Sequence, residues 1–261
     1  MEEQKGKPHK QSSYLKYERN RVMKLLDNGI YDTESWFRIA GPLRGSKQWK
    51  VGRSAFELAS YMTQTLPDAP VKIAQCLRDA GVDTTQPFEW GAEYVTSFAK
   101  HGLGRGSGRH HDAALWNAGT FMGIEAKADE PLDYYVSEIL SDASDNKKRR
   151  IDGLCRMAFG DDAVNHPTIR YQLLTALGGV LLEAQSRKAE NAVLLILTFL
   201  KEGADTRGLP YYSPAKVDTN TQDIERFLNA LHWDEKTGRV STVLGAKNNI
   251  NTFVQHYTLS V

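Results

Sequence analysis

The stretch RHHDAALWNAGTFMGIEAKA, residues 109–128, decides the fold because it predicts a β-hairpin with two apolar arms. Residues 111–116 and 121–128 have the composition of strands. The tetrapeptide NAGT at 117–120 is a polar connection of hairpin length, and its glycine can adopt a positive φ. The hairpin therefore brings together side chains that lie more than ten residues apart in the chain.

Three of those side chains have the chemistry of a phosphodiester-cleaving site. Asp112 lies on the first arm, and Glu125 and Lys127 share one face of the second, since successive side chains of a strand alternate. Phosphodiester hydrolysis needs oxygen ligands for Mg²⁺ or Mn²⁺, an activated water and positive charge near the transition state. We expect Asp112, Glu125 and the carbonyl of Ala126 to hold the metal. Lys127 would orient the nucleophile or neutralise developing charge.

The tripeptide Glu125-Ala126-Lys127 carries little weight without its strand context. A chain of this length contains roughly a few acid-x-lysine matches by chance. Such matches also occur at residues 3–5, 145–147 and 234–236, and none of them has an apolar strand around it. An alternative interpretation is a cross-strand salt bridge on a solvent-facing sheet surface, worth under about 1 kcal/mol.

The segment that follows the hairpin predicts an α/β core. Residues 169–185 place apolar side chains on one stripe at helical spacing, and residues 191–200 form a continuous apolar run typical of a central strand. Gly178 and Gly179 inside the helix predict close approach to a sheet or another helix. Strand, hairpin, helix and buried strand together indicate an α/β layered core.

Further elements surround this core. We expect residues 1–13 to be a mobile polar tail and residues 14–261 to be a single domain with its core at about 50–200. A flexible loop is expected over residues 102–109, which are rich in glycine. Strands are predicted over 89–99 and 253–261, and helices over 17–26, 32–40, 54–65, 71–80, 131–140, 147–159 and 221–232.

Composition limits the number of domains, the possible partners and the cellular location of the protein. The chain has 261 residues, 41% of them hydrophobic and 25% charged, which suits one globular domain. Its net charge of +1 means that any nucleic-acid contact must come from a local basic patch. Two distant cysteines indicate neither a disulfide framework nor a cysteine zinc site. The longest apolar run, residues 192–200, is too short for a bilayer, and we expect a cytoplasmic protein without membrane contact.

The arrangement resembles the PD-(D/E)XK phosphodiesterase superfamily, whose fold is restriction-endonuclease-like. The matching residues are Asp112 and Glu125-Ala126-Lys127, and residues 124–131 and 169–174 resemble a poorly characterised bacterial branch. The resemblance covers about residues 50–200, although no proline precedes Asp112. It implies a three-layer αβα sandwich with a central mixed β-sheet, a bound Mg²⁺ or Mn²⁺, and cleavage of nucleic acid, with DNA favoured over RNA and endonuclease action favoured.

Two further site residues follow from that resemblance, and four basic residues follow from the sequence itself. Glu57, on an early helix, matches an additional metal ligand, but Ser54-x-x-Glu57 also matches a capping box. Gln172 sits where related nucleases carry a polar residue that reaches the site, and a solvent-facing glutamine is the alternative. Four basic residues could contact phosphates: Arg105, Arg109, Lys147 and Lys148. The alternative for the two arginines is a disordered connector, and the alternative for the two lysines is a solvated helix start.

The expected partner is nucleic acid, and two further kinds of partner are consistent with the resemblance. A homodimer would allow both strands of a duplex to be cut, and partner proteins of a phage-defence system would fit a frequent setting of the superfamily. The main alternative is a catalytically inactive nucleic-acid-binding or protein-interaction module that retains the fold. A third is an unrelated α/β protein with a surface salt bridge.

Overall fold

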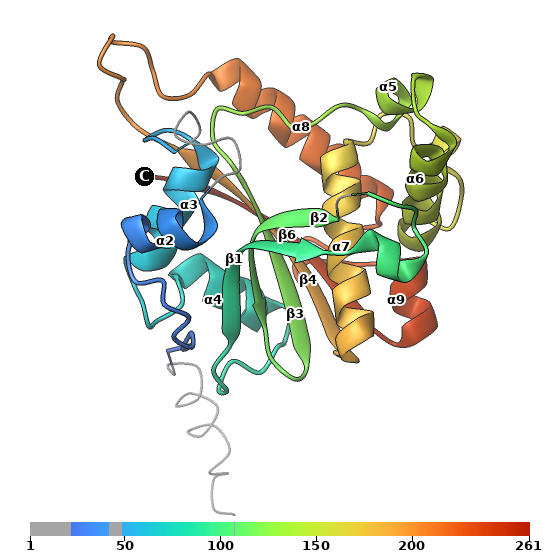
Figure 1. Cartoon of the computed structure of the whole chain (residues 1–261), viewed down its shortest axis with the longest axis horizontal. Coiled ribbons are helices and arrows are strands. Elements are labelled where there is room, and N and C mark those ends of the chain that lie inside the picture. Colours follow the sequence, from blue (N-terminus) through green and yellow to red (C-terminus); the bar gives the residue numbers. More distant parts are fainter. Residues whose placement is uncertain (1–21, 42–48, 107) are drawn as a thin grey trace, which may run out of the picture.

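A six-stranded mixed β-sheet forms the centre of the protein (Figure 1). The computed structural model describes residues 22–41, 49–106 and 108–261. The strands lie in the order β1-β2-β3-β4-β6-β5; β3, β4 and β6 run parallel, and the other neighbours are antiparallel. Their bounds are β1 Glu89–Thr96, β2 Arg109–Trp116, β3 Thr120–Lys127, β4 Asn191–Leu200, β5 Arg239–Val240 and β6 Asn251–Ser260. The α/β class and the mixed sheet are confirmed.

The predicted hairpin forms between β2 and β3. Its register pairs Ala113 with Ile124 and Trp116 with Phe121. The connection is closed by the side chain of Asn117, which accepts a hydrogen bond from the Gly119 N–H at 3.0 Å. Gly119 does not have the positive φ that the sequence allowed, because the asparagine side chain forms the turn instead.

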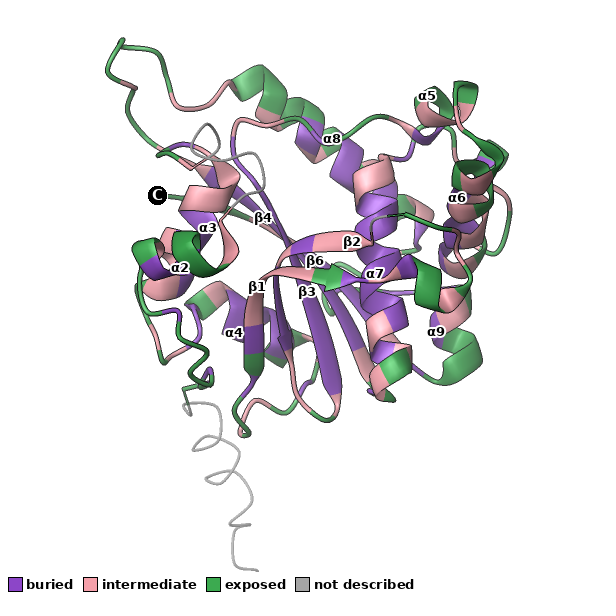
Figure 2. Ribbon diagram, in the orientation of Figure 1, coloured by how far each residue is buried: buried purple, intermediate pink, exposed green. Residues whose placement is uncertain are grey.

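Helices cover both faces of the sheet, and each face has its own apolar cluster (Figures 1 and 2). One cluster includes Trp36, Leu58, Ile73 and Phe199, and the other includes Leu154, Leu177 and Phe227. The strands β3 and β4 between them are buried along nearly their whole length. Helices of the first side are α2 Thr33–Ala40, α3 Ser54–Thr63 and α4 Val71–Asp79; those of the second are α6 Asp145–Ala158, α7 Tyr171–Arg187, α8 Pro214–Ala230 and α9 Val243–Asn248.

Short segments complete the fold. They are α5 Val136–Ser141 and two 3-10 turns, Phe98–His101 and Ala163–Asn165. Across the ranges given above, no helix combines the length and the apolar character needed to traverse a bilayer.

The glycine pair of α7 allows the close approach that the sequence predicted. A Cβ added at Gly178 would collide with Leu154 of α6, and one added at Gly179 would lie 2.6 Å from Nε2 of His111 on β2. The two glycines thus face a helix and the sheet respectively. They allow α7 to lie directly against the strand that carries Asp112.

One predicted helix is wrong at its described residues, one begins later than expected and one begins earlier. Residues 22–26 are not helical, and residues 17–21 and the tail at 1–13 lie outside the described residues. Met23 and Leu25 are buried while their neighbours are exposed, which is the two-residue period of an extended chain. Residues 131–135 are not helical either, because the Leu132 N–H donates to Asn220 Oδ1 at 3.0 Å. Helix α8 begins at Pro214 rather than near residue 221.

Candidate active site

The hairpin brings together the three side chains singled out in the sequence. Asp112 Oδ2 accepts a hydrogen bond from the Ala126 N–H at 2.7 Å, which ties the first arm to the second. On the second arm, Lys127 Nζ lies 3.1 Å from Glu125 Oε1. Asp112, Glu125 and Lys127 therefore belong to one cluster at the carboxyl end of β3, as predicted from strand alternation.

Glu125 is the buried centre of this cluster. Its carboxylate has no exposed surface, and it forms ion pairs with Arg109 and Lys127 and accepts a hydrogen bond from Gln172 Nε2. The ion pair with Arg109 joins Glu125 Oε2 to Arg109 Nη2. A salt bridge on a solvent-facing surface, the alternative interpretation of this hairpin, is wrong because these ion pairs are internal.

Burial and charge act in opposite directions on the two basic groups. Burial lowers the pKa of Lys127 from its ordinary value, and the nearby Asp112 carboxylate opposes that shift. Burial also lowers the pKa of Arg109, again against the charge of Asp112. Both cations are thus held in the interior by carboxylates, and loss of a carboxylate would leave them without compensation.

A cavity of about 890 Å³ opens beside the cluster. Asp112, Lys127, Arg109 and Gln172 line it, whereas Glu125 lies behind its wall. The remaining charged and aromatic lining residues are Phe98, His110, Glu130, Asp133, Tyr134, Glu138, Arg150, Arg170 and Tyr171. A volume of this size falls in the range of roughly 300–1,000 Å³ that small-molecule sites occupy.

Gln172 reaches the site, as predicted, and links it to the segment at 129–135. Its Nε2 donates to Glu125, and its Oε1 accepts a hydrogen bond from the Asp133 N–H at 3.2 Å. Both ends of the amide are therefore engaged, which fixes its orientation. The alternative of a solvent-facing glutamine is wrong.

Glu57 does not join this cluster. It is buried, accepts a hydrogen bond from the Gly52 N–H at 2.7 Å, and is not among the residues that line the cavity. The predicted capping box is wrong as well, since Arg53 rather than Ser54 is the N-cap of α3. The carboxylate instead holds the turn before the helix. Among the residues described, no group of three or more His, Cys, Asp or Glu side chains could share a metal ion.

Three of the four predicted phosphate-contacting residues form one exposed surface. The Arg105 N–H donates to Asn146 Oδ1 at 3.1 Å, and the Arg105 carbonyl accepts from Asn146 Nδ2 at 2.9 Å. These bonds hold the glycine-rich loop against the start of α6, where Lys147 and Lys148 are exposed. The interpretation of this loop as a disordered connector is wrong at Arg105, because both backbone polar groups of that residue are bound.

Arg109 behaves differently from the other three. Its side chain is only 12% exposed, and its guanidinium contacts Glu125 instead of pointing to solvent. The reason is its position as the first residue of β2, next to a buried carboxylate that needs compensation. The sequence interpretation placed Arg109 in an exposed loop, whereas it begins β2 and lies against Glu125 while also lining the cavity. Its contact with phosphate stays a prediction.

Glu93 is a site residue that the sequence interpretation missed. The β1–β2 register pairs Ala92 with Ala113 and Tyr94 with His111, which places Glu93 opposite Asp112. Its backbone has φ 49, a region that non-glycine residues rarely adopt. Burial, and then the charge of Asp112, raise the pKa of Glu93 to about 7. The only sequence signal for Glu93 was an acid placed among the apolar residues of a strand. Nothing in the sequence indicated its left-handed backbone conformation.

Comparison with known proteins identifies a family. The family described as Domain of unknown function (DUF6946) matches residues 30–259. The chain belongs to this family. No curated protein and no solved structure matches the chain. The DUF6946 match includes Asp112, Glu125, Lys127 and Gln172, so the candidate site lies inside the family domain.

Proposed function

We propose that this DUF6946 protein is a metal-dependent nuclease that hydrolyses phosphodiester bonds through a PD-(D/E)XK site. DNA is favoured over RNA as the substrate, and endonuclease action in the cytoplasm is favoured. The observation that carries the proposal is the 2.7 Å hydrogen bond between Asp112 and the Ala126 N–H. It joins the upstream acid to the acid-x-lysine strand at the wall of a cavity.

The arrangement of layers supports a three-layer αβα sandwich of restriction-endonuclease-like type. One apolar cluster joins α3 and α4 to the sheet, and a second joins α6, α7 and α8 to its other face. The hairpin β2–β3, the helix α7 and the parallel strand β4 follow in the order that this architecture requires.

The donor atoms present fit a hard divalent cation. Asp112 and Glu125 supply carboxylate oxygens, and Ala126 lies between Glu125 and Lys127 with its carbonyl as a further oxygen. Glu125 Oε2 lies against the Arg109 guanidinium, so a cation bound here would share this carboxylate with Arg109. Bound there, Mg²⁺ or Mn²⁺ would lower the pKa of an attacking water and stabilise charge on the phosphate.

The protein groups supply position and charge. Lys127 lines the cavity with an ammonium beside Glu125, where it can orient a water or stabilise a developing oxyanion. Gln172 holds the Glu125 carboxylate from the α7 side. Asp112, hydrogen-bonded through Oδ2 to the backbone, keeps its carboxylate at the cavity surface.

Incubation with plasmid, single-stranded DNA and RNA, in Mn²⁺ and in EDTA, tests the proposal. Cleavage is expected in Mn²⁺ only, and Lys127→Ala should lower it by at least about 100-fold. Lys247→Ala, an exposed lysine on α9 outside the cavity, is the matched control and should cleave like the unaltered chain. Cleavage that survives Lys127→Ala would refute the assignment.

A specific observation favours the inactive nucleic-acid-binding module as a second candidate. Glu125 is enclosed by Arg109, Lys127 and Gln172, and these donors occupy a carboxylate that a metal would have to share. Under this alternative the chain binds nucleic acid, Mn²⁺ does not shift its melting temperature, and Lys127→Ala changes nothing but stability. A thermal-shift titration with Mn²⁺ separates the two candidates.

A further inference from the structure

Tyr134 is an exposed aromatic side chain on the wall of the cavity. It is 66% exposed and lies in the segment between β3 and α5, which has no regular secondary structure around it. Within the described part of the chain, its ring makes no aromatic or cation contact and its hydroxyl makes no hydrogen bond. An apolar ring face is thus presented to solvent beside Asp112 and Lys127.

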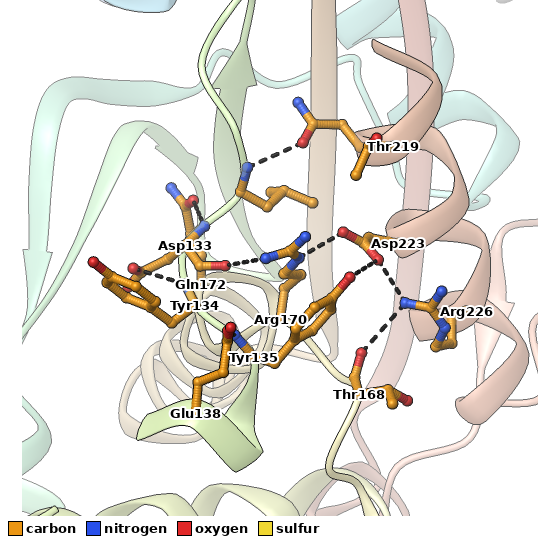
Figure 3. A network of polar contacts seen from close by, with 12 residues as sticks. Asp133, Tyr134, Tyr135, Glu138, Thr168, Arg170, Gln172, Thr219, Asp223 and Arg226 are labelled. Atoms are coloured by element: carbon orange, nitrogen blue, oxygen red, sulfur yellow. Dashed lines mark hydrogen bonds and ion pairs between the residues drawn. The ribbon is translucent and has the colours of Figure 1, made fainter. Parts of the chain in front are cut away.

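The backbone that carries Tyr134 is held from both sides (Figure 3). Its N–H donates to Asp133 Oδ1 at 2.8 Å, and its carbonyl accepts from the Tyr171 N–H at 3.0 Å. The preceding residue is held as well, because the Asp133 carbonyl accepts from Arg170 Nη1 at 3.0 Å. An exposed residue on a loop would ordinarily be mobile. The hydrogen bonds that fix the backbone at Asp133 and Tyr134 therefore need an explanation.

A buried ionic cluster holds the segment at residues 133–135 in place. Asp223 of α8 is only 2% exposed, and it accepts hydrogen bonds from Arg170 Nε at 2.5 Å and from the Tyr135 hydroxyl at 3.1 Å. The Arg170 guanidinium also lies 3.7 Å from the centre of the Tyr135 ring. Figure 3 shows these side chains gathered between α8 and the segment that bears Tyr134, whose own ring points away from them.

Three acidic side chains near Tyr134 each accept a hydrogen bond from a backbone N–H. Asp133 accepts from Tyr134, Glu138 Oε2 accepts from the Tyr135 N–H at 2.6 Å, and Glu130 Oε2 accepts from the Ala128 N–H at 3.1 Å. Arg150, which also lines the cavity, donates hydrogen bonds to the carbonyls of Leu103 and Arg105 in the glycine-rich loop. Four cationic side chains line the same cavity and are the groups that a phosphate chain would contact: Arg109, Lys127, Arg150 and Arg170.

We propose that Tyr134 is a stacking platform for the base of an unpaired nucleotide, so that the substrate is a single-stranded or locally opened nucleic acid. Aromatic side chains beside a cationic groove hold single strands in this way, whereas the bases of a duplex are stacked on each other and present no free face. A cavity of about 890 Å³ is also large enough for one or a few nucleotides. The inference rests on the proposed nuclease function and specifies that its substrate is single-stranded or locally opened.

Oligonucleotide binding in EDTA, where cleavage is not expected, tests the platform by fluorescence anisotropy with labelled single strands of DNA and RNA and with the matching duplex. Tyr134→Ala should weaken single-strand binding by about 5- to 150-fold, the effect of losing one stacked base. Tyr134→Phe retains the ring and should bind like the unaltered chain. Tyr31→Ala is the matched control, since Tyr31 is 64% exposed but does not line the cavity.

Three results would overturn the platform. Tyr134→Ala could bind single strands as tightly as the unaltered chain, Tyr134→Phe could bind as weakly as Tyr134→Ala, or duplex binding could fall by the same factor. If Mn²⁺-dependent cleavage persists and depends on Lys127, such a result refutes the platform alone. If the unaltered chain neither binds nor cleaves any of these substrates, the proposed function fails together with it.

Discussion

Glu125→Gln removes the negative charge from a carboxylate that has no exposed surface while keeping its shape. Arg109 and Lys127, with side chains 12% and 8% exposed, would then remain in the interior without their closest counter-charge. Removing one partner of a buried ion pair costs about 3–5 kcal/mol, so we expect the free energy of unfolding to fall by that amount. The corresponding shift in melting temperature is on the order of 10 °C for a chain of this size.

Urea denaturation of four proteins measures this effect: the unaltered chain, Glu125→Gln, Arg109→Met and the double variant. The double variant should lose less stability than the sum of the single losses, because the second change removes a cation that the first left unpaired. Asp68→Asn is the surface control, since the Lys24–Asp68 pair is largely exposed, and it should cost under about 1 kcal/mol. A Glu125→Gln loss of under about 1 kcal/mol, or strictly additive losses, would refute the buried-cluster reasoning.

Three further predictions concern stability and order. Burial holds the pKa of His256 at about 4, below the value of about 6.5 expected in the unfolded chain. The unfolded chain therefore binds more protons below pH 6.5, and the contribution of His256, full above that pH, declines by about 3 kcal/mol as the pH falls to 4. Urea titrations should show this acid loss in the unaltered chain and not in His256→Gln, and equal pH slopes would contradict it. Gly179→Ala should destabilise by about 1–3 kcal/mol, less the helix propensity gained, because its Cβ would lie 2.6 Å from His111 Nε2. Gly119→Ala, where the added carbon would meet no atom within 4 Å beyond its chain neighbours, is the control in the same thermal unfolding assay, and equal melting temperatures would contradict the overpacking. Asp223→Asn should cost about 2 kcal/mol and accelerate amide hydrogen exchange at residues 133–135, since Arg170 loses the carboxylate that positions it. Unchanged exchange there would show that Asp223 does not order the segment.

The central elements were predictable because their patterns are local. The strand at 191–200 is a continuous apolar run, and it forms β4 with the same bounds. The hairpin arms and α7 likewise follow from period-two and period-3.6 patterns within a few residues of their observed ends. Gly178 and Gly179 signalled close packing because few other reasons place two glycines inside a helix.

Failures occurred where long-range hydrogen bonds replaced local ones. Residues 131–135 begin with a proline that favours a helix start. Asn220 of α8 and Gln172 of α7 nevertheless accept hydrogen bonds from the N–H groups of Leu132 and Asp133. The helix expected over residues 17–26 was wrong at 22–26 for a related reason. Lys24 and Leu25 form bridges with Asp68 and Phe88, which no local pattern reveals.

In the candidate site, too, local patterns predicted some features and long-range contacts decided the others. Strand alternation sufficed to predict that Asp112, Glu125 and Lys127 would meet, and Gln172 followed from the resemblance. Sequence patterns did not show that Glu125 would be fully enclosed, that Arg109 would turn inward to it, or that Glu93 would lie opposite Asp112. Those features depend on which strands are neighbours and on how deeply the sheet edge is covered.

Sequence alone determined the α/β class, the hairpin and the meeting of two acids with a lysine, because strand period and turn length act over a few residues. Tertiary structure alone decided the electrostatic state of that cluster. Burial of Glu125 between β2, β3 and α7 converts a common tripeptide into an internal ion-pair cluster, and the anchoring of residues 129–135 by α8 places Tyr134 beside it. Gln172 lies 47 residues from Glu125, and Asn220 lies 88 residues from Leu132, so this burial and anchoring depend on distant segments that no local pattern records.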